Sequence, residues 1–168
     1  MAMRKAAQIA QQALQATLPV IRFSISERDL ASELTLQLLR AGSDSDIPFA
    51  PIVSAGPNSA NPHASPSDRL LQPGDLLVLD FGAGHQGYIS DITRTFALGD
   101  IGPEYAQIAR LVLEANTASR ELARPGLSAH EVDQAARAVI TAGGYGPYFT
   151  HRTGHGLGLE SHEEPYIR

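Results

Sequence analysis

The chain has 168 residues, enough for one domain with a hydrophobic core or for part of a larger domain. A hydrophobic content of 43% with mixed charges is typical of a globular protein, and a net charge of −5 without a basic stripe argues against nucleic acid as a partner. The absence of cysteine excludes disulfides, thiolate zinc sites and a cysteine nucleophile, so any metal must take oxygen or nitrogen ligands.

The predicted elements alternate between helices and strands. Helices are expected over 3–18, 26–42, 103–123 and 128–143, and strands over 47–54, 76–81 and 88–97. The last two strands are joined by a glycine-containing turn over 82–87. No apolar run approaches the ~18 residues that a membrane span needs, and we expect a cytoplasmic protein with no membrane partner.

The predicted helices repeat at an offset of 102 residues. Matched pairs include caps, core positions and terminal glycines: Ser26 with Ser128, Asp29 with Glu131, Leu30 with Val132, Leu38 with Ile140, and Gly42 with Gly144. We therefore expect a duplicated helix-helix-strand-strand unit in an α/β (α+β) fold. The same offset carries Asp80 and Asp91 to positions 182 and 193, beyond Arg168, so the second half is expected to be incomplete.

Two aspartates lie in the predicted hairpin. Asp80 follows an apolar strand, where an ionised carboxylate costs several kcal/mol unless a cation or hydrogen bonds compensate it. Asp91 lies eleven residues further on, a separation that a hairpin can fold face to face, although alone it could be a solvated strand residue. His155 lies between two glycines and has no obvious role in a core, which favours a metal ligand.

Several motifs in this order resemble the pita-bread metallopeptidases, and within them the Xaa-Pro branch of prolidase and aminopeptidase P. The motifs are Pro-Asn-Ser-Ala-Asn-Pro-His ending at His63, Asp80-Phe-Gly, Ser90-Asp-Ile-Thr-Arg-Thr, His151-Arg-Thr-Gly-His-Gly-Leu-Gly and His162-Glu-Glu-Pro. The resemblance implies that residues 1–168 form a catalytic domain with a curved antiparallel sheet, lacking its last strands and without a creatinase-like N-terminal domain.

The resemblance also implies roles for individual residues. Asp80 would bind one metal ion, Asp91 would bridge two, and His155 would bind the other. His63 and His162 would hydrogen-bond the substrate and the tetrahedral intermediate, as catalytic residues, and His151 would lie beside the proline pocket. The family adds two glutamate ligands from a later hairpin; Glu160, Glu163 and Glu164 come too early in the motif to replace them.

The expected reaction is release of an N-terminal residue from Xaa-Pro peptides or dipeptides by metal-activated hydroxide. Two divalent ions are expected, with manganese favoured by the carboxylate-rich site and cobalt or zinc as substitutes. Without the missing glutamates, we expect the 168-residue chain to be inactive alone. The main alternative is a non-catalytic binding or scaffold module with the same fold; a metal-independent creatinase-like hydrolase is disfavoured. The sequence does not distinguish a dipeptidase from an aminopeptidase. Self-association into a homo-oligomer also stays open.

Overall fold

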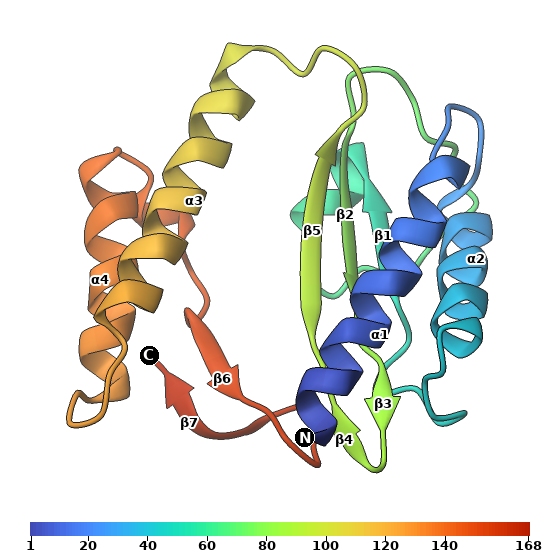
Figure 1. Ribbon diagram of the computed structural model, residues 1–168. Coiled ribbons are helices and arrows are strands. Elements are labelled where there is room, and N and C mark those ends of the chain that lie inside the picture. The colour runs from blue at the N-terminus through green and yellow to red at the C-terminus, as the bar shows by residue number, and fades with distance from the viewer. The chain divides into compact units, whose positions relative to one another are not determined.

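The computed structural model describes residues 1–168 and has the mixed α/β class expected from the sequence. The chain divides into two compact units. Unit 1 contains Met1–Ile101 and Leu157–Ser161, and unit 2 contains Gly102–Gly156 and His162–Arg168. Near its end the chain therefore leaves unit 2, contributes a short segment to unit 1, and returns to unit 2 (Figure 1).

Unit 1 combines two α-helices with a three-stranded antiparallel sheet and a small hairpin. In chain order the elements are α1 (Ala2–Thr17), α2 (Glu27–Arg40), β1 (Ile52–Ala55), β2 (Leu76–Phe81), β3 (Gly84–His85), β4 (Tyr88–Ile89) and β5 (Ile92–Ala97), with short 3-10 helices η1 (Leu18–Val20) and η2 (Gly56–Ala60). The main sheet has the order β1-β2-β5, and β3 pairs with β4.

The core of unit 1 lies between α1, α2 and one face of this sheet (Figure 1). Side chains of β2 alternate, so that Leu77, Leu79 and Phe81 are fully buried while the residues between them are half-buried. They pack with apolar residues of both helices, including Ile9 and Leu34. The opposite face of β2, which carries Asp80, is therefore turned away from the helices.

The strand predicted over 88–97 is divided into β4 and β5. Gln86 and Gly87 have φ values of 54° and 77°, a pair of positive values typical of a two-residue hairpin turn, and this turn pairs β4 with β3. Ser90 then bonds back to Ala83 through both its backbone N–H and its hydroxyl, which interrupts the pairing before β5 begins. The strand predicted over 47–54 is confined to β1, since Pro48 and Pro51 cannot donate to a sheet.

Unit 2 contains α3 (Pro103–Leu122), α4 (Ala129–Ala142), the 3-10 helix η3 (Gly146–Tyr148) and the antiparallel pair β6 (Gly154–Gly156) and β7 (Glu163–Ile167). Ser128 and Glu131 form the expected capping box at the start of α4. The buried apolar cluster is small, with Ala115, Ala136 and Ile140 at its centre.

The offset of 102 residues appears in the structure. It carries the bounds of α2 onto those of α4, and it carries the N-cap Ser26 onto Ser128. It also carries the glycine with positive φ after each helix, Gly42, onto Gly144. Each unit thus has two helices followed by strands.

None of the helices has both the length and the apolar character that a membrane span requires.

Candidate functional site

Asp80 and Asp91 lie at the ends of two paired strands of unit 1. Asp80 is in β2 opposite Thr93 of β5, and it accepts a hydrogen bond of 3.0 Å from the Thr93 hydroxyl. Asp91 directly precedes Ile92, the first residue of β5, whose partner is Phe81. Both aspartates are half-buried. The hairpin thus brings two carboxylate-bearing positions to the same end of adjacent strands.

A close backbone approach fixes this end of the hairpin. A Cβ added to Gly82 would lie 2.1 Å from the carbonyl oxygen of Ser90, so only glycine fits there. Ser90 in turn accepts a hydrogen bond of 3.0 Å from the N–H of Ala83 through its hydroxyl oxygen. Glycine is therefore required at position 82 because the backbone of Ser90 lies so close. The same close approach determines where Asp91 lies relative to β2.

His63 lies in the exposed loop that follows η2, and its N–H donates to the side-chain oxygen of Asn61 at 3.0 Å. The loop is anchored by Glu27, a fully buried carboxylate at the first position of α2. Glu27 accepts hydrogen bonds from the N–H of Ala55 (2.7 Å) and from the N–H (3.0 Å) and hydroxyl (2.6 Å) of Ser67. These contacts connect α2 with both ends of the loop that carries His63.

Glu27 stays ionised in this buried position. Burial acts to raise its pKa, but the hydrogen bonds from Ser67, Ala55 and Asn58 outweigh burial and hold the pKa below its ordinary value. Sequence reasoning missed this residue. The available signal was an acidic residue directly after an N-cap serine, which is common at helix starts and therefore not specific.

His155 and His162 lie together in unit 2. His155 is in β6, His162 directly precedes β7, and the two ring centroids are 4.3 Å apart with the planes tilted by 42°. The strands approach closely here, since a Cβ added to Gly156 would lie 2.5 Å from the carbonyl oxygen of Glu164. Gly156 thus permits the close approach of β6 and β7.

Neighbouring carbonyl groups determine which ring nitrogens of two histidines carry hydrogen. Nδ1 of His155 lies 2.8 Å from the carbonyl oxygen of Gly156, and Nδ1 of His151 lies 2.7 Å from that of Arg152. Because a carbonyl oxygen only accepts, Nδ1 must be the donor in both rings. In the neutral imidazole, the lone pair is then on Nε2, the arrangement that a metal-binding histidine uses.

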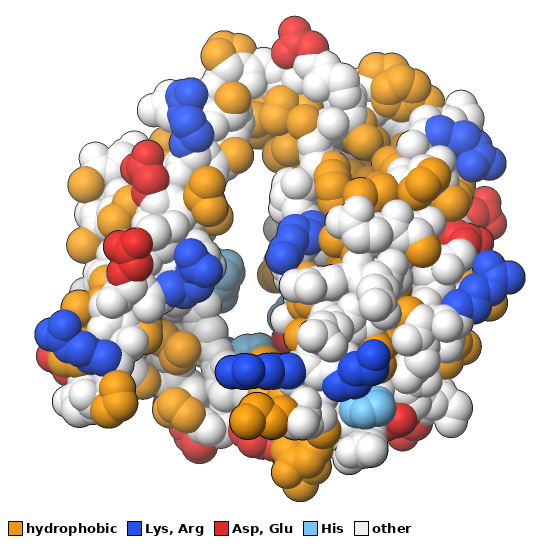
Figure 2. All heavy atoms as spheres, in the orientation of Figure 1, with side chains coloured by type: hydrophobic (Ala, Val, Ile, Leu, Met, Phe, Trp, Pro, Cys, Tyr) orange, Lys and Arg blue, Asp and Glu red, His pale blue; other side chains and the backbone are white.

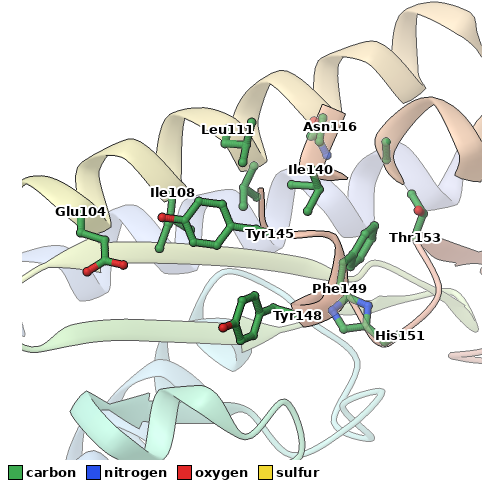
Figure 3. A pocket seen from close by; sticks show the side chains of 13 residues that line it. Glu104, Ile108, Leu111, Asn116, Ile140, Tyr145, Tyr148, Phe149, His151 and Thr153 are labelled. Atoms are coloured by element: carbon green, nitrogen blue, oxygen red, sulfur yellow. The ribbon is translucent and has the colours of Figure 1, made fainter. Parts of the chain in front are cut away.

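His151 lies at an apolar cavity of about 620 Å³ within unit 2. Figure 3 shows Tyr148, Phe149 and His151 along one side and Ile108 and Leu111 of α3 along another. The His151 side chain is exposed and meets the edge of the Phe149 ring, with centroids 5.1 Å apart. Sequence reasoning predicted His151 but missed the Asp133–Arg137 pair of α4 that holds its backbone.

The predicted ligands are divided between the units: Asp80 and Asp91 belong to unit 1 and His155 to unit 2. Within either unit, no group of three or more His, Asp or Glu side chains could hold a metal ion. The donor chemistry nevertheless fits a divalent transition metal, with carboxylate oxygens from the aspartates and an imidazole nitrogen with its lone pair on Nε2. The ligand roles of Asp80, Asp91 and His155, and those of His63, His151 and His162, stay predictions.

The sequence matches Metallopeptidase family M24 over residues 1–168, and the chain belongs to that family. The family recognised from the sequence motifs is confirmed.

Within this family, the chain is similar to Xaa-Pro dipeptidases and to an aminopeptidase. An Xaa-Pro dipeptidase of Lactobacillus delbrueckii subsp. lactis is 41% identical over 165 residues, which cover 98% of this chain and 45% of the relative. The structure of an Xaa-Pro dipeptidase from Bacillus anthracis matches with a TM-score of 0.95 and 41% identity, covering 98% of this chain and 46% of that one. The aminopeptidase PepP of Pseudomonas aeruginosa matches with a TM-score of 0.89 and 33% identity, covering 99% and 42%. The chain thus spans a little under half the length of these relatives.

Proposed function

We propose that the protein containing this chain is a metal-dependent peptidase that releases the N-terminal residue from Xaa-Pro peptides or dipeptides. The observation that carries the proposal is the match to family M24 over the whole chain, together with similarity to Xaa-Pro dipeptidases at about 40% identity. The presence of Asp80, Asp91 and His155 in their motifs adds support, because a scaffold protein would have no need of these side chains.

In this proposal Asp80, Asp91 and the Nε2 atom of His155 would hold divalent metal, with manganese favoured and cobalt or zinc as substitutes. A bound divalent metal would lower the pKa of water to about 7, and would so supply hydroxide for peptide hydrolysis at neutral pH. The hydrogen bond from Thr93 to Asp80 supports this role, since a donor on one carboxylate oxygen orients the other.

The histidines have separate tasks in the proposed reaction. His63 and His162 hydrogen-bond the substrate and the oxyanion that develops at the scissile carbonyl. The ring of His162 is supported by its contact with His155. His151 contacts the proline side of the substrate through Nε2, because its Nδ1–H donates to the carbonyl oxygen of Arg152.

We propose further that residues 1–168 belong to an internally duplicated pita-bread catalytic domain. The offset of 102 residues supports this, since it relates the helices of unit 1 to those of unit 2. Applied to β2 and β5, it places a second hairpin beyond Arg168, and we assign the remaining acidic ligands to that hairpin. The 168-residue polypeptide alone should then be inactive.

The test compares the 168-residue polypeptide with the full-length protein, each treated with chelator and then supplied with manganese. The full-length protein should cleave Xaa-Pro substrates only after manganese is restored, and its Asp91→Asn variant should not recover. The short polypeptide should show no turnover. Metal-independent turnover, or a folded full-length protein that binds peptides without cleaving them, would favour one of the alternatives. Robust turnover by the short polypeptide would overturn the assignment of ligands beyond Arg168.

A further inference from the structure

An ion pair on α4, between a buried aspartate and a half-buried arginine, has no role in the function proposed above. Asp133 is 1% exposed, and its Oδ2 atom accepts a hydrogen bond of 2.6 Å from Nε of Arg137, one helical turn further on. The Arg137 side chain keeps 29% of its surface exposed, but the carboxylate of Asp133 is withdrawn from water, and this desolvation penalty offsets the attraction between the two charges. The pair is therefore weak evidence of a purely stabilising role, and its other contacts decide what it does.

The guanidinium group of Arg137 also contacts the segment that carries His151. Its two terminal guanidinium nitrogens donate to the carbonyl oxygens of Phe149 (2.8 Å) and His151 (2.6 Å). The guanidinium carbon also lies 4.4 Å from the centroid of the Phe149 ring, whose edge meets the His151 ring. Arg137 thus holds the backbone of His151 directly and its imidazole through Phe149.

Asp133 holds the next part of the same segment. Its Oδ1 atom accepts hydrogen bonds from the hydroxyl (2.7 Å) and the N–H (3.2 Å) of Thr153. Burial acts to raise the pKa of Asp133, but the hydrogen bonds from Arg137 and Thr153 outweigh burial and lower the pKa, so the carboxylate stays charged. Together the two side chains bind His151 itself and the residues two positions before and after it, Phe149 and Thr153.

We propose that Arg137, oriented by Asp133, is a positioning residue that sets where the His151 imidazole meets the substrate. This rests on the proposed function, in which His151 contacts the proline side of an Xaa-Pro peptide. The guanidinium fork is essential because three nitrogens point to three different acceptors, whereas a lysine ammonium cannot hold the two carbonyls and Asp133 in one plane. Displacing a substrate-contacting group by about 1 Å can lower the rate of an enzymatic reaction about a hundredfold.

The experiment measures kcat and KM for an Xaa-Pro dipeptide with full-length, manganese-loaded enzyme. Arg137→Lys should raise KM by roughly tenfold or more, with a smaller change in kcat. The matched control is Arg28→Lys, which alters the pair between Arg28 of α2 and Asp68 of a loop, whose side chains are 62% and 87% exposed, and which should leave both constants unchanged. Histidine NMR spectra of the same proteins should show the His151 ring resonances shifted in Arg137→Lys and not in Arg28→Lys.

A double-mutant cycle separates positioning from general stability. If Arg137 acts through His151, Arg137→Lys should add almost nothing to the KM of a His151→Ala enzyme. Full additivity in that background, or unchanged His151 resonances in Arg137→Lys, would overturn the inference while leaving the proposed function intact. An inactive but folded wild-type enzyme would instead overturn the proposed function, and the positioning role with it.

Discussion

At the scale of single residues, Glu27 shows how a buried carboxylate can organise a loop. It lies at the start of α2, yet its hydrogen-bond donors come from Ala55, Asn58 and Ser67, on both sides of His63. The aspartate of the Arg69–Asp75 pair closes the following turn by accepting a hydrogen bond of 2.9 Å from the N–H of Gln72. The geometry of the His63 loop therefore depends on charged groups that do not belong to the candidate site.

Replacing Glu27 by glutamine should destabilise the protein by about 1–3 kcal/mol at pH 7, because an amide NH₂ would face the donors of Ser67. The folded pKa of Glu27 is below that of the unfolded chain, so its contribution is present above an unfolded pKa of about 4.3 and is lost as the pH falls through the folded pKa. Urea unfolding at several pH values should therefore show a gap between wild type and Glu27→Gln that narrows below pH 4.

The control for this experiment is Asp68→Asn, which removes an exposed carboxylate from the same loop. Exposed ion pairs contribute little, so this variant should unfold close to the wild type at pH 7. Equal losses in both variants would mean that charge at the loop, rather than the buried hydrogen bonds of Glu27, supports stability.

Residue-scale sequence reasoning can single out side chains whose sequence context is local. Asp80 could be singled out because an acid after Leu-Val-Leu is unusual in a buried strand. Glu27, Asp133 and Arg137 could not, since their partners in the loops lie 14 to 40 residues away and their acidic or basic character is ordinary on a helix. Only the tertiary structure distinguishes such a residue from a solvated charge.

At the scale of elements, helix ends were predictable and strand ends only in part: β2 spans the predicted residues 76–81, whereas β1 and the strand predicted over 88–97 differ from the prediction. Ser26 and Ser128 each cap a helix by accepting from the N–H three residues on, and Gly42 and Gly144 follow the helix ends with positive φ. These are local signals. The limits of β1, β4 and β5 instead depend on prolines and on the contact of Ser90 with Ala83, which a periodicity pattern does not reveal.

The β6–β7 pair offers a test with a matched control on the same strand. A Cβ at Gly156 would lie 2.5 Å and 2.9 Å from the backbone carbonyl oxygens of Glu164 and Glu163, so Gly156→Ala must displace β7. We expect a loss of about 1–3 kcal/mol in thermal or urea unfolding and disruption of the His155–His162 contact. Gly154→Ala should cost much less, because its Cβ would meet only the Ile167 side chain at an ordinary 3.5 Å. Similar losses for both would show that space is not what requires glycine at Gly156.

At the scale of the whole molecule, the two units use their related helices differently. Ala10 of α1 is fully buried, whereas Val112, its counterpart at the offset of 102 residues in α3, is 53% exposed. Leu113 and Tyr148 are exposed as well, and Figure 2 shows hydrophobic side chains at the surface of the α3–α4 part of unit 2. Exposed apolar surface of this kind promotes association with other molecules unless another part of the protein covers it.

We therefore expect the 168-residue polypeptide to bind a hydrophobic dye such as ANS and to associate at micromolar concentration, while the full-length protein does neither. Dye fluorescence and light scattering measure this directly. Val112→Ser, which removes exposed apolar area from α3, should reduce both signals, and Ser32→Thr on the exposed side of α2 serves as a control. A monomeric short polypeptide without dye binding would contradict the expectation.

The segment Leu157–Ser161 has a consequence for how the chain is made. Unit 1 is encoded almost entirely before residue 102, yet the N–H of Ile89 donates to the carbonyl oxygen of Gly158, and the Ser161 hydroxyl to that of Pro48. A chain emerging from the ribosome can therefore build the α1–α2–sheet core early, but it cannot complete the β4 edge until the helices of unit 2 have also been synthesised. During that interval the edge at Ile89 is open to chaperones and to other nascent chains. Residues 157–161 thus complete a unit whose other residues all precede position 102.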